Sequence, residues 1–212
     1  NLRKDHPLFA QRVRQAARVG CAVSVVNSSA SDWAMPVQHT QVAPASGWLQ
    51  ALADIAAAIA VEKHVTAPLG GQVTEFSKAV ASSLLGGESK AVLLGNAVAH
   101  HSQAGQLLAM ANWIGGHTGA TVGFLTEAAN TVGAQLVGAL PGEGGLNAGQ
   151  MLSGVLKATF LLNNEPEFDS AAGRASIAAL KQCEMVVTLS PFKANMEMSD
   201  VLLPISPFTE TP

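Results

Sequence analysis

The sequence predicts an α/β fold with a doubly wound, mostly parallel sheet and flanking helices. Short apolar runs of strand length alternate along the 212 residues with longer segments of helical periodicity. Strands that alternate with helices are joined by crossover connections, and such strands run parallel. The runs are continuously apolar, which is typical of a sheet that helices cover on both faces.

The chain is expected to open with a helix and a strand. Pro7 is favoured at the first position of a helix, and apolar residues recur at helical spacing from Phe9. Gly20 ends this helix, and the β-branched run over residues 21–26 has the length and composition of a strand. Residues 27–47 are rich in small and polar groups, so they are expected to form a loop.

Two helices are expected next. Residues 48–61 are rich in alanine and apolar nearly all round, which is typical of a buried helix. Residues 64–73 contain Pro68 and a glycine pair, and they predict a linker. Thr74 is a favoured N-cap for a shorter helix, which a second glycine pair ends after residue 85.

The rest of the chain continues the alternation of strands and helices. The expected elements are a strand over 91–94, a helix over 102–114, an irregular glycine-rich loop over 121–140, a helix over 146–156, a strand over 158–162, a helix over 170–182, a strand over 185–189, a short helix ending near 196 and a last strand over 201–203. The chain has no initial Met and ends in an expected loop, so we interpret residues 1–212 as a fragment of a longer polypeptide. It is expected to form either one domain or two sub-lobes, about 1–85 and 86–212.

The composition limits the kinds of partner. Apolar residues make up 48% of the chain and charged residues 13%, so either its solvated surface is small or part of it is buried against a partner. A net charge of −3 argues against nucleic-acid binding. Five of the twelve basic residues nevertheless fall within the first eighteen positions, which indicates either a solvated helix face or a docking face. These residues are Arg3, Lys4, Arg12, Arg14 and Arg18.

The two cysteines, Cys21 and Cys183, are far apart and have no partner at metal-ligand spacing, so both are expected to be buried free thiols. An iron–sulfur cluster needs about four cysteine ligands, and none is therefore expected in this region. No apolar run is long enough to span a bilayer, so any membrane association is expected to be indirect, through partners.

No catalytic or metal-binding set is evident among the nucleophiles and histidines. Metal ligands on one helix lie three or four residues apart, a spacing that His100, His101 and His117 lack. The adjacent pair is interpreted as capping the helix expected from residue 102. Gly95-Asn96 lacks the spacing of a nucleotide-binding loop and is interpreted as a tight turn.

The candidate sites are the turns that follow the expected strands, because ligands of open α/β sheets bind at the carboxyl ends of the strands. These turns cover residues 27–29, 95–101, 163–165 and 190–193.

Several of these segments resemble the molybdopterin oxidoreductase family. Residues 1–7, Asn-Leu-Arg-Lys-Asp-His-Pro, are similar to an element of that family, and residues 161–169 resemble its second copy. Residues 129–134 resemble the family's Asn- and Gly-rich loop. Residues 185–211, which include Ser-Pro-Phe and Leu-Leu-Pro-Ile-Ser-Pro-Phe-Thr-Glu-Thr, resemble in detail the branch of the family that forms part of an iron–sulfur subunit of bacterial NADH-quinone oxidoreductase, respiratory complex I.

The resemblance implies a molybdopterin oxidoreductase-like α/β domain. Active members of the family use these loops to hold the guanine-dinucleotide arms of the cofactor, while the residue that ligates molybdenum lies upstream of this region. If this chain were part of an active member, the residues in contact with the cofactor would be Asn1, Asn163, Ser190 and Thr211.

Two departures from the family pattern argue against a bound cofactor. Leu2 stands where cofactor-binding relatives often have Pro, and Glu165 follows Asn164 where Gly-Xaa-Asn-Pro is common. A carboxylate repels phosphate unless a cation neutralises it. We therefore expect a structural domain of complex I with no catalytic residue and no cofactor of its own. The alternatives are a cofactor-cradling part of an active molybdopterin-dependent oxidoreductase and a free-standing nucleotide-binding domain.

The resemblance also implies the surroundings of the chain. The expected partners are other domains of its own subunit and other subunits of the peripheral arm, with iron–sulfur clusters elsewhere in the same subunit. The expected location is the cytoplasmic side of the bacterial inner membrane, with the membrane reached only through the complex.

Overall fold

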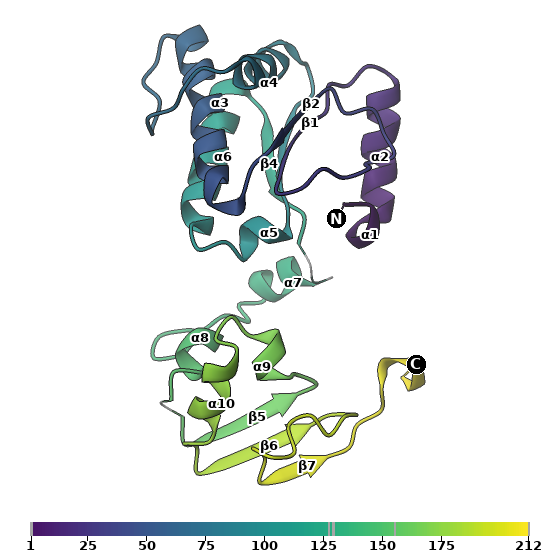
Figure 1. Ribbon diagram of the computed structural model, residues 1–212, viewed down its shortest axis with the longest axis vertical. Helices are drawn as coiled ribbons and strands as arrows, with labels where there is room; N and C mark the ends of the chain where they lie inside the picture. Colours follow the sequence, from purple (N-terminus) through teal and green to yellow (C-terminus); the bar gives the residue numbers. More distant parts are fainter. Residues whose placement is uncertain (1, 127, 129, 155, 212) are drawn as a thin grey trace. The chain divides into compact units, whose positions relative to one another are not determined.

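The computed structural model describes residues 2–126, 128, 130–154 and 156–211 (Figure 1). The chain forms two compact units, Asn1–Thr131 (unit 1) and Val132–Pro212 (unit 2). The expected boundary near residue 85 instead lies inside unit 1, because side chains from both sides of that position share one hydrophobic core.

Unit 1 contains two small parallel sheets and most of the helices. Its elements are α1 (Leu2–Asp5), α2 (Pro7–Arg18), β1 (Ser24–Asn27), β2 (His39–Val42), the 3-10 turn η1 (Ala45–Gly47), α3 (Trp48–Lys63), α4 (Glu75–Gly86), β3 (Ala91–Leu94), α5 (Asn96–Ala99), α6 (Ala104–Thr118) and β4 (Thr121–Phe124). Helix α7 (Thr131–Leu136) spans the boundary between the units.

The strands of unit 1 pair in parallel, as expected for the α/β class. β1 pairs with β2, and β3 pairs with β4. Figure 1 shows these strands between α2 on one side and α3, α4 and α6 on the other, which is the layering of a doubly wound fold. The expected single sheet is divided in this unit, because no ladder joins β1 to β3 among the described residues.

Two strands of unit 1 lie in segments that were expected to be loops. β2 alternates between half-buried and exposed residues, and β4 contains Gly123, so neither has the continuous apolar run that marks a buried strand. Both are strands because an apolar strand lies beside each of them and supplies a ladder partner. Of the loop expected over residues 121–140, residues 127 and 129 lie outside the described part.

The core of unit 1 forms where α3, α4 and α6 meet. Helix α3 is buried on most of its surface, which confirms the prediction from its alanine-rich composition. Small side chains let neighbouring helices approach closely, and larger side chains from α4 and α6 fill the remaining space. The buried residues of this core are Ala53, Ile55, Ala56, Ala58, Ile59, Val80, Ala81, Met110 and Ile114.

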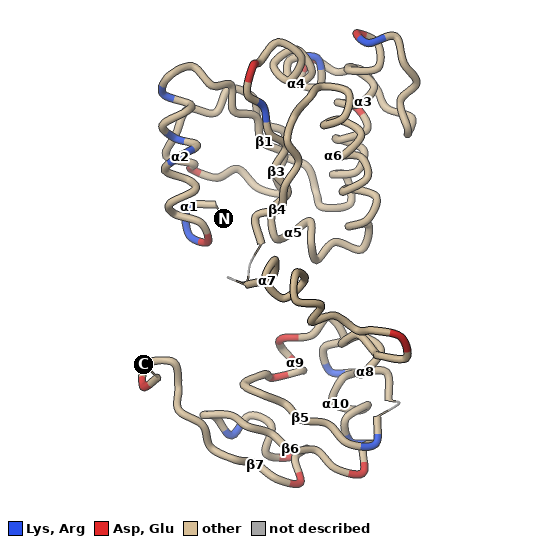
Figure 2. The backbone as a smooth tube through the Cα atoms, turned by 180° about the vertical axis from the view of Figure 1, so that it is seen from behind, with Lys and Arg blue, Asp and Glu red and all other residues tan. Residues whose placement is uncertain are grey.

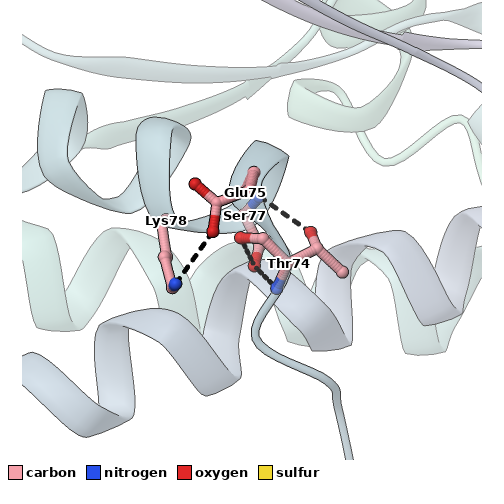
Figure 3. A network of polar contacts seen from close by, with 4 residues as sticks. All are labelled: Thr74, Glu75, Ser77 and Lys78. Atoms are coloured by element: carbon pink, nitrogen blue, oxygen red, sulfur yellow. Dashed lines mark hydrogen bonds and ion pairs between the residues drawn. The ribbon is translucent and has the colours of Figure 1, made fainter.

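Local hydrogen bonds determine where α4 begins. The hydroxyl of Thr74 accepts the backbone N–H of Ser77 at 3.1 Å, and the hydroxyl oxygen of Ser77 accepts the backbone N–H of Thr74 at 2.8 Å. This reciprocal pair is a capping box, and an ion pair between Glu75 and Lys78 lies beside it (Figure 3). The capping role expected for Thr74 is therefore confirmed.

Unit 2 is a three-stranded parallel sheet with short helices. Its elements are α8 (Ala148–Met151), β5 (Ala158–Leu162), α9 (Pro166–Asp169), α10 (Arg174–Leu180), β6 (Met185–Leu189), β7 (Val201–Leu203) and the 3-10 turn η2 (Phe208–Glu210). The strand order is β5-β6-β7. Leu161, Leu180 and Val186 form its small core.

The helices of unit 2 are shorter than the sequence predicts. The helix expected over 146–156 is observed only as α8, and Val155 of that range lies outside the described residues. The helix expected over 170–182 begins only at Arg174, because Gly173 has a φ of 53° and interrupts it. The short helix expected to end near residue 196 is a series of turns.

The expectation that both thiols are buried is wrong for Cys21 and only partly met by Cys183. Cys21 is exposed because the strand begins only at Ser24, so this cysteine lies in the irregular segment before the strand. Cys183 is half-buried and packs on the core of unit 2. Both are free cysteines. Within the described part of the chain, no helix is long and apolar enough to cross a membrane.

Candidate functional site

Two of the four candidate residues, Asn163 and Ser190, lie side by side at the carboxyl end of the sheet in unit 2. Asn163 follows β5 and has a left-handed backbone with a φ of 48°. Its N–H donates to the carbonyl of Leu189, the last residue of β6, at 2.8 Å. Ser190 comes next in the chain and is only 5% exposed. Parallel pairing of β5 with β6 therefore brings the two turns together.

The other two candidate residues are not part of this arrangement. Thr211 is exposed beyond η2, and its hydroxyl donates to the carbonyl of Phe208 at 3.0 Å. No hydrogen bond joins Thr211 to Asn163 or Ser190 among the described residues. Asn1 lies outside the described residues.

A buried polar network links the two turns, and the sequence did not reveal it. The side-chain amide of Asn195 donates to the carbonyl of Asn164 at 2.7 Å. The hydroxyl of Ser199 donates to the carbonyl of Asn195 and lies 2.7 Å from the hydroxyl of Thr188. Because a hydroxyl has one proton, Thr188 is the donor to Ser199. The only signals of this network in the sequence were a polar residue in an apolar strand, Thr188, and an asparagine in a turn, Asn195.

The turn after β5 carries a concentration of negative charge. Glu165, Glu167 and Asp169 lie on or just before α9 (Figure 2). The carboxylate of Asp169 accepts the backbone N–H of Glu165 at 2.7 Å. A carboxylate of the chain itself therefore occupies the N–H group that an incoming anion would use. The guanidinium of Arg174 is 3.0 Å from Glu167, and this ion pair is largely exposed.

The turns after β1 and β3 in unit 1 adjoin a cavity of about 270 Å³. Apolar side chains from both strands and from α3, α4 and α6 provide most of its lining. Ser24 is one of the few polar residues there, and its hydroxyl oxygen is buried without a hydrogen-bond partner in the described structure. The amide of Asn27 instead donates to the carbonyl of Ser29 at 3.0 Å, so this turn is closed by its own residues.

The histidines have structural contacts. His101 accepts the N–H of Gln103 at Nδ1, so its Nε2 carries the proton and donates to the carbonyl of Ala45 at 3.1 Å. The ring of His117 stacks on Trp113 with 4.0 Å between centroids. The helix that was expected from residue 102 begins at Ala104, with Gln103 as its N-cap. No group of three or more His, Cys, Asp or Glu residues could hold a metal ion within the described ranges.

One comparison with known proteins identifies the kind of domain. The family model described as molybdopterin oxidoreductase matches residues 1–212, the whole length of the chain. No curated protein sequence matches the chain.

Proposed function

The chain belongs to the molybdopterin oxidoreductase family, and from this premise we propose that it is a structural domain of respiratory complex I. In this proposal it lies in a subunit of the peripheral arm of NADH-quinone oxidoreductase, which supports electron transfer from NADH to quinone. The domain itself has no catalytic residue. It reaches the cytoplasmic face of the bacterial inner membrane only through the rest of the complex.

The acidic turn after β5 is the observation that carries the proposal. Active members of the family hold a doubly phosphorylated nucleotide arm with loops of this kind, and such a ligand needs N–H donors or cations. Here the turn presents Glu165 and Glu167, and the carboxylate of Asp169 already accepts one backbone N–H. The cation beside this turn, Arg174, is engaged with Glu167 at 3.0 Å. The residues at this turn therefore do not fit a phosphate-bearing cofactor.

The surface of unit 2 supports a packing role. Phe160 is 73% exposed and Leu162 is 69% exposed, and both alternate with the buried Leu161 along β5. They therefore lie on the face of the strand opposite the core. A parallel sheet is normally covered on both faces. We infer that this apolar face is covered by another part of the subunit or by a neighbouring subunit.

The basic residues of α2 support docking as well. Arg12, Arg14 and Arg18 are exposed, and none has an ion-pair partner among the described residues. Figure 2 shows basic positions along this helix. Leu8 and Val19 are also exposed near the two ends of this helix. Only Ala10 of α2 is buried. A helix with exposed basic residues and exposed apolar residues is suited to an acidic partner surface.

The alternative function is supported by the adjacency of Asn163 and Ser190. In an active molybdopterin-dependent oxidoreductase these neutral polar groups would contact the cofactor, which would supply the redox chemistry. The buried hydroxyl of Ser190 accepts the N–H of Phe192 at 3.0 Å, so its own proton remains available to a ligand. The hydroxyl of Ser190 offers a ligand a single hydrogen bond. The negative charge of the neighbouring turn, in contrast, repels every phosphate oxygen of the cofactor.

The test is the metal and pterin content of the native assembly. The complex that carries this chain is purified through a tag, assayed for NADH oxidation, and analysed for molybdenum, tungsten and fluorescent pterin. The proposal expects complex I subunits to co-purify with NADH oxidation and pterin to be far below one equivalent per chain. Stoichiometric pterin with either metal would establish the alternative. Recovery without complex I subunits would overturn the assignment to complex I.

A further inference from the structure

A small pocket of about 180 Å³ lies beside α2 in unit 1, and we call it the α2 pocket. Helix α1 contributes Arg3 to its lining, and α2 contributes residues that include Gln11 and Arg14. The segment between β1 and β2 forms the rest of the lining with residues that include Trp33 and Met35. Three segments that are separate in the sequence therefore meet around one opening.

The described lining of the α2 pocket contains positive charge and no carboxylate. Arg3 and Arg14 are its charged residues, and neither Asp nor Glu is among the residues that line it. Arg14 is exposed and has no ion-pair partner among the described residues. A guanidinium group presents several N–H donors in a planar fork that matches the two oxygens of a carboxylate. The pocket is therefore suited to an anion.

Asp32 holds two walls of the pocket together. Its carboxylate lies 3.3 Å from the guanidinium of Arg3, which also donates to the carbonyl of Asp32 at 2.9 Å. The other carboxylate oxygen accepts the N–H of Ala34 at 2.8 Å. These contacts join α1 to the segment before β2, so a ligand would find the walls already in place and would lose little free energy in ordering them. Because Asp32 already accompanies Arg3, the charge of the pocket depends chiefly on Arg14.

The size and the apolar part of the lining favour a single side chain over a whole cofactor. Pockets that hold cofactors and drug-sized ligands measure about 300–1,000 Å³, and the α2 pocket is smaller than this range. Pro7, Ala10 and Trp33 provide apolar surface beside the arginines. A ligand with a carboxylate at the end of a short apolar stem would meet both kinds of surface. The glutamate side chain has this form.

We propose that the α2 pocket holds one glutamate side chain of the partner on which α2 docks, with the glutamate carboxylate at Arg14. The inference rests on the docking proposed above for α2, and it names the side chain and the position through which that docking acts. Arginine and tryptophan are enriched at the few positions that contribute most of the binding energy of an interface. Arg14 and Trp33 supply one of each around this pocket.

The first test titrates the purified protein with butyrate and follows tryptophan fluorescence. Butyrate has the carbon atoms and the carboxylate of a glutamate side chain, and butyramide is its uncharged counterpart. We expect a saturable change with butyrate at about millimolar concentration, because so small a ligand makes few contacts, and no such change with butyramide. Trp33→Phe should remove the signal, which would show that it comes from the pocket.

Two variants of α2 provide the matched comparison for this titration. Arg14→Gln should abolish the response to butyrate, whereas Arg12→Gln should retain it. Arg12 is exposed on the same helix and carries the same charge, but it does not line the pocket. The proposal would be overturned if the protein gave no saturable response, if Arg14→Gln or Trp33→Phe retained it, or if inorganic phosphate bound more tightly than butyrate.

The second test uses the native assembly. Arg14→Gln should lower the amount of chain recovered with its complex about fivefold, whereas Arg12→Gln should leave recovery unchanged. Equal losses from the two variants would mean that α2 docks through its overall charge, and normal recovery of Arg14→Gln would mean that the pocket is not used. Either result would overturn the assignment to the pocket. The identity of the co-purifying subunits tests the proposed function separately, because butyrate binding is measured without them.

Discussion

The carboxylate of Asp54 accepts the backbone N–H of Gln72 at 2.8 Å, which ties the linker after α3 back onto that helix. Asp54 is 9% exposed, and it also accepts a hydrogen bond from the side chain of Gln50 at 2.8 Å. An acidic residue in an otherwise apolar helix is thereby satisfied by the segment that follows it.

Replacing Asp54 is expected to loosen this linker. In Asp54→Ala the N–H of Gln72 loses a charged acceptor, and bonds of this kind contribute about 1.5–3 kcal/mol. Urea denaturation of the variant should show a decrease of that size in the free energy of unfolding. Glu62→Ala, on the exposed face of the same helix, is the matched control and should change stability by less than about 0.5 kcal/mol. Equal effects from the two variants would contradict a structural role for Asp54.

Two adjacent glycines in this linker should respond differently to alanine. A Cβ at Gly71 would clash with the carbonyl oxygen of Ala53, which is backbone and is held within α3. Gly71→Ala is therefore expected to destabilise the protein by about 1–3 kcal/mol. A Cβ at Gly70 would meet nothing within 4 Å, so Gly70→Ala should be close to neutral. The comparison requires only thermal melts, and a neutral Gly71→Ala would show that the linker can move away from α3.

The capping box of α4 should matter more than the ion pair beside it. Thr74→Ala leaves the N–H of Ser77 without its acceptor, and loss of an N-cap side chain costs about 1 kcal/mol. Lys78→Ala removes an exposed ion pair with Glu75 and should cost less than about 0.5 kcal/mol. Urea melts of both variants test this order, and a larger effect from Lys78→Ala would reverse our account of how α4 begins.

The network at the carboxyl end of unit 2 should hold the turn after β5 in place. Asn195→Ala removes the donor to the carbonyl of Asn164, and the lost bond should lower stability by about 1 kcal/mol. Hydrogen exchange around residues 163–165 should become faster in this variant. Lys193→Ala changes an exposed side chain of the neighbouring turn and should leave exchange there unaltered. Unchanged exchange in Asn195→Ala would mean that the hydrogen bonds between β5 and β6 alone position the turn after β5.

The basic residues of α2 are expected to contribute to assembly. Because Arg12 and Arg14 are exposed, reversing both charges should leave the fold intact while repelling an acidic partner surface. The amount of chain recovered with the NADH-oxidising complex on native gels should fall about tenfold, whereas the circular dichroism spectrum stays the same. Lys157→Glu combined with Lys181→Glu makes the same change in net charge on unit 2 and serves as the control. Normal assembly of the α2 variant would rule out this helix as a docking face.

The family membership and the acidic turn are two separate findings about this domain. The match over residues 1–212 places the chain in a family of oxidoreductases. The turn after β5, however, satisfies one of its own N–H groups with Asp169 and adds the carboxylates of Glu165 and Glu167. One fold can carry carboxyl-end turns of different chemistry, because a parallel sheet depends on the apolar side chains that face its core.

The sequence by itself determined the α/β class, the parallel pairing and the buried position of α3, because these depend on apolar periodicity that is visible in a single chain. It also indicated that Asn163 and Ser190 follow neighbouring strands. Only the tertiary structure decided that His39–Val42 and Thr121–Phe124 are strands, since each depends on a partner strand for its hydrogen bonds. It likewise decided that Asp54 accepts a hydrogen bond from Gln72 and that Asn195 donates one to Asn164. Contacts between residues distant in sequence have no local pattern.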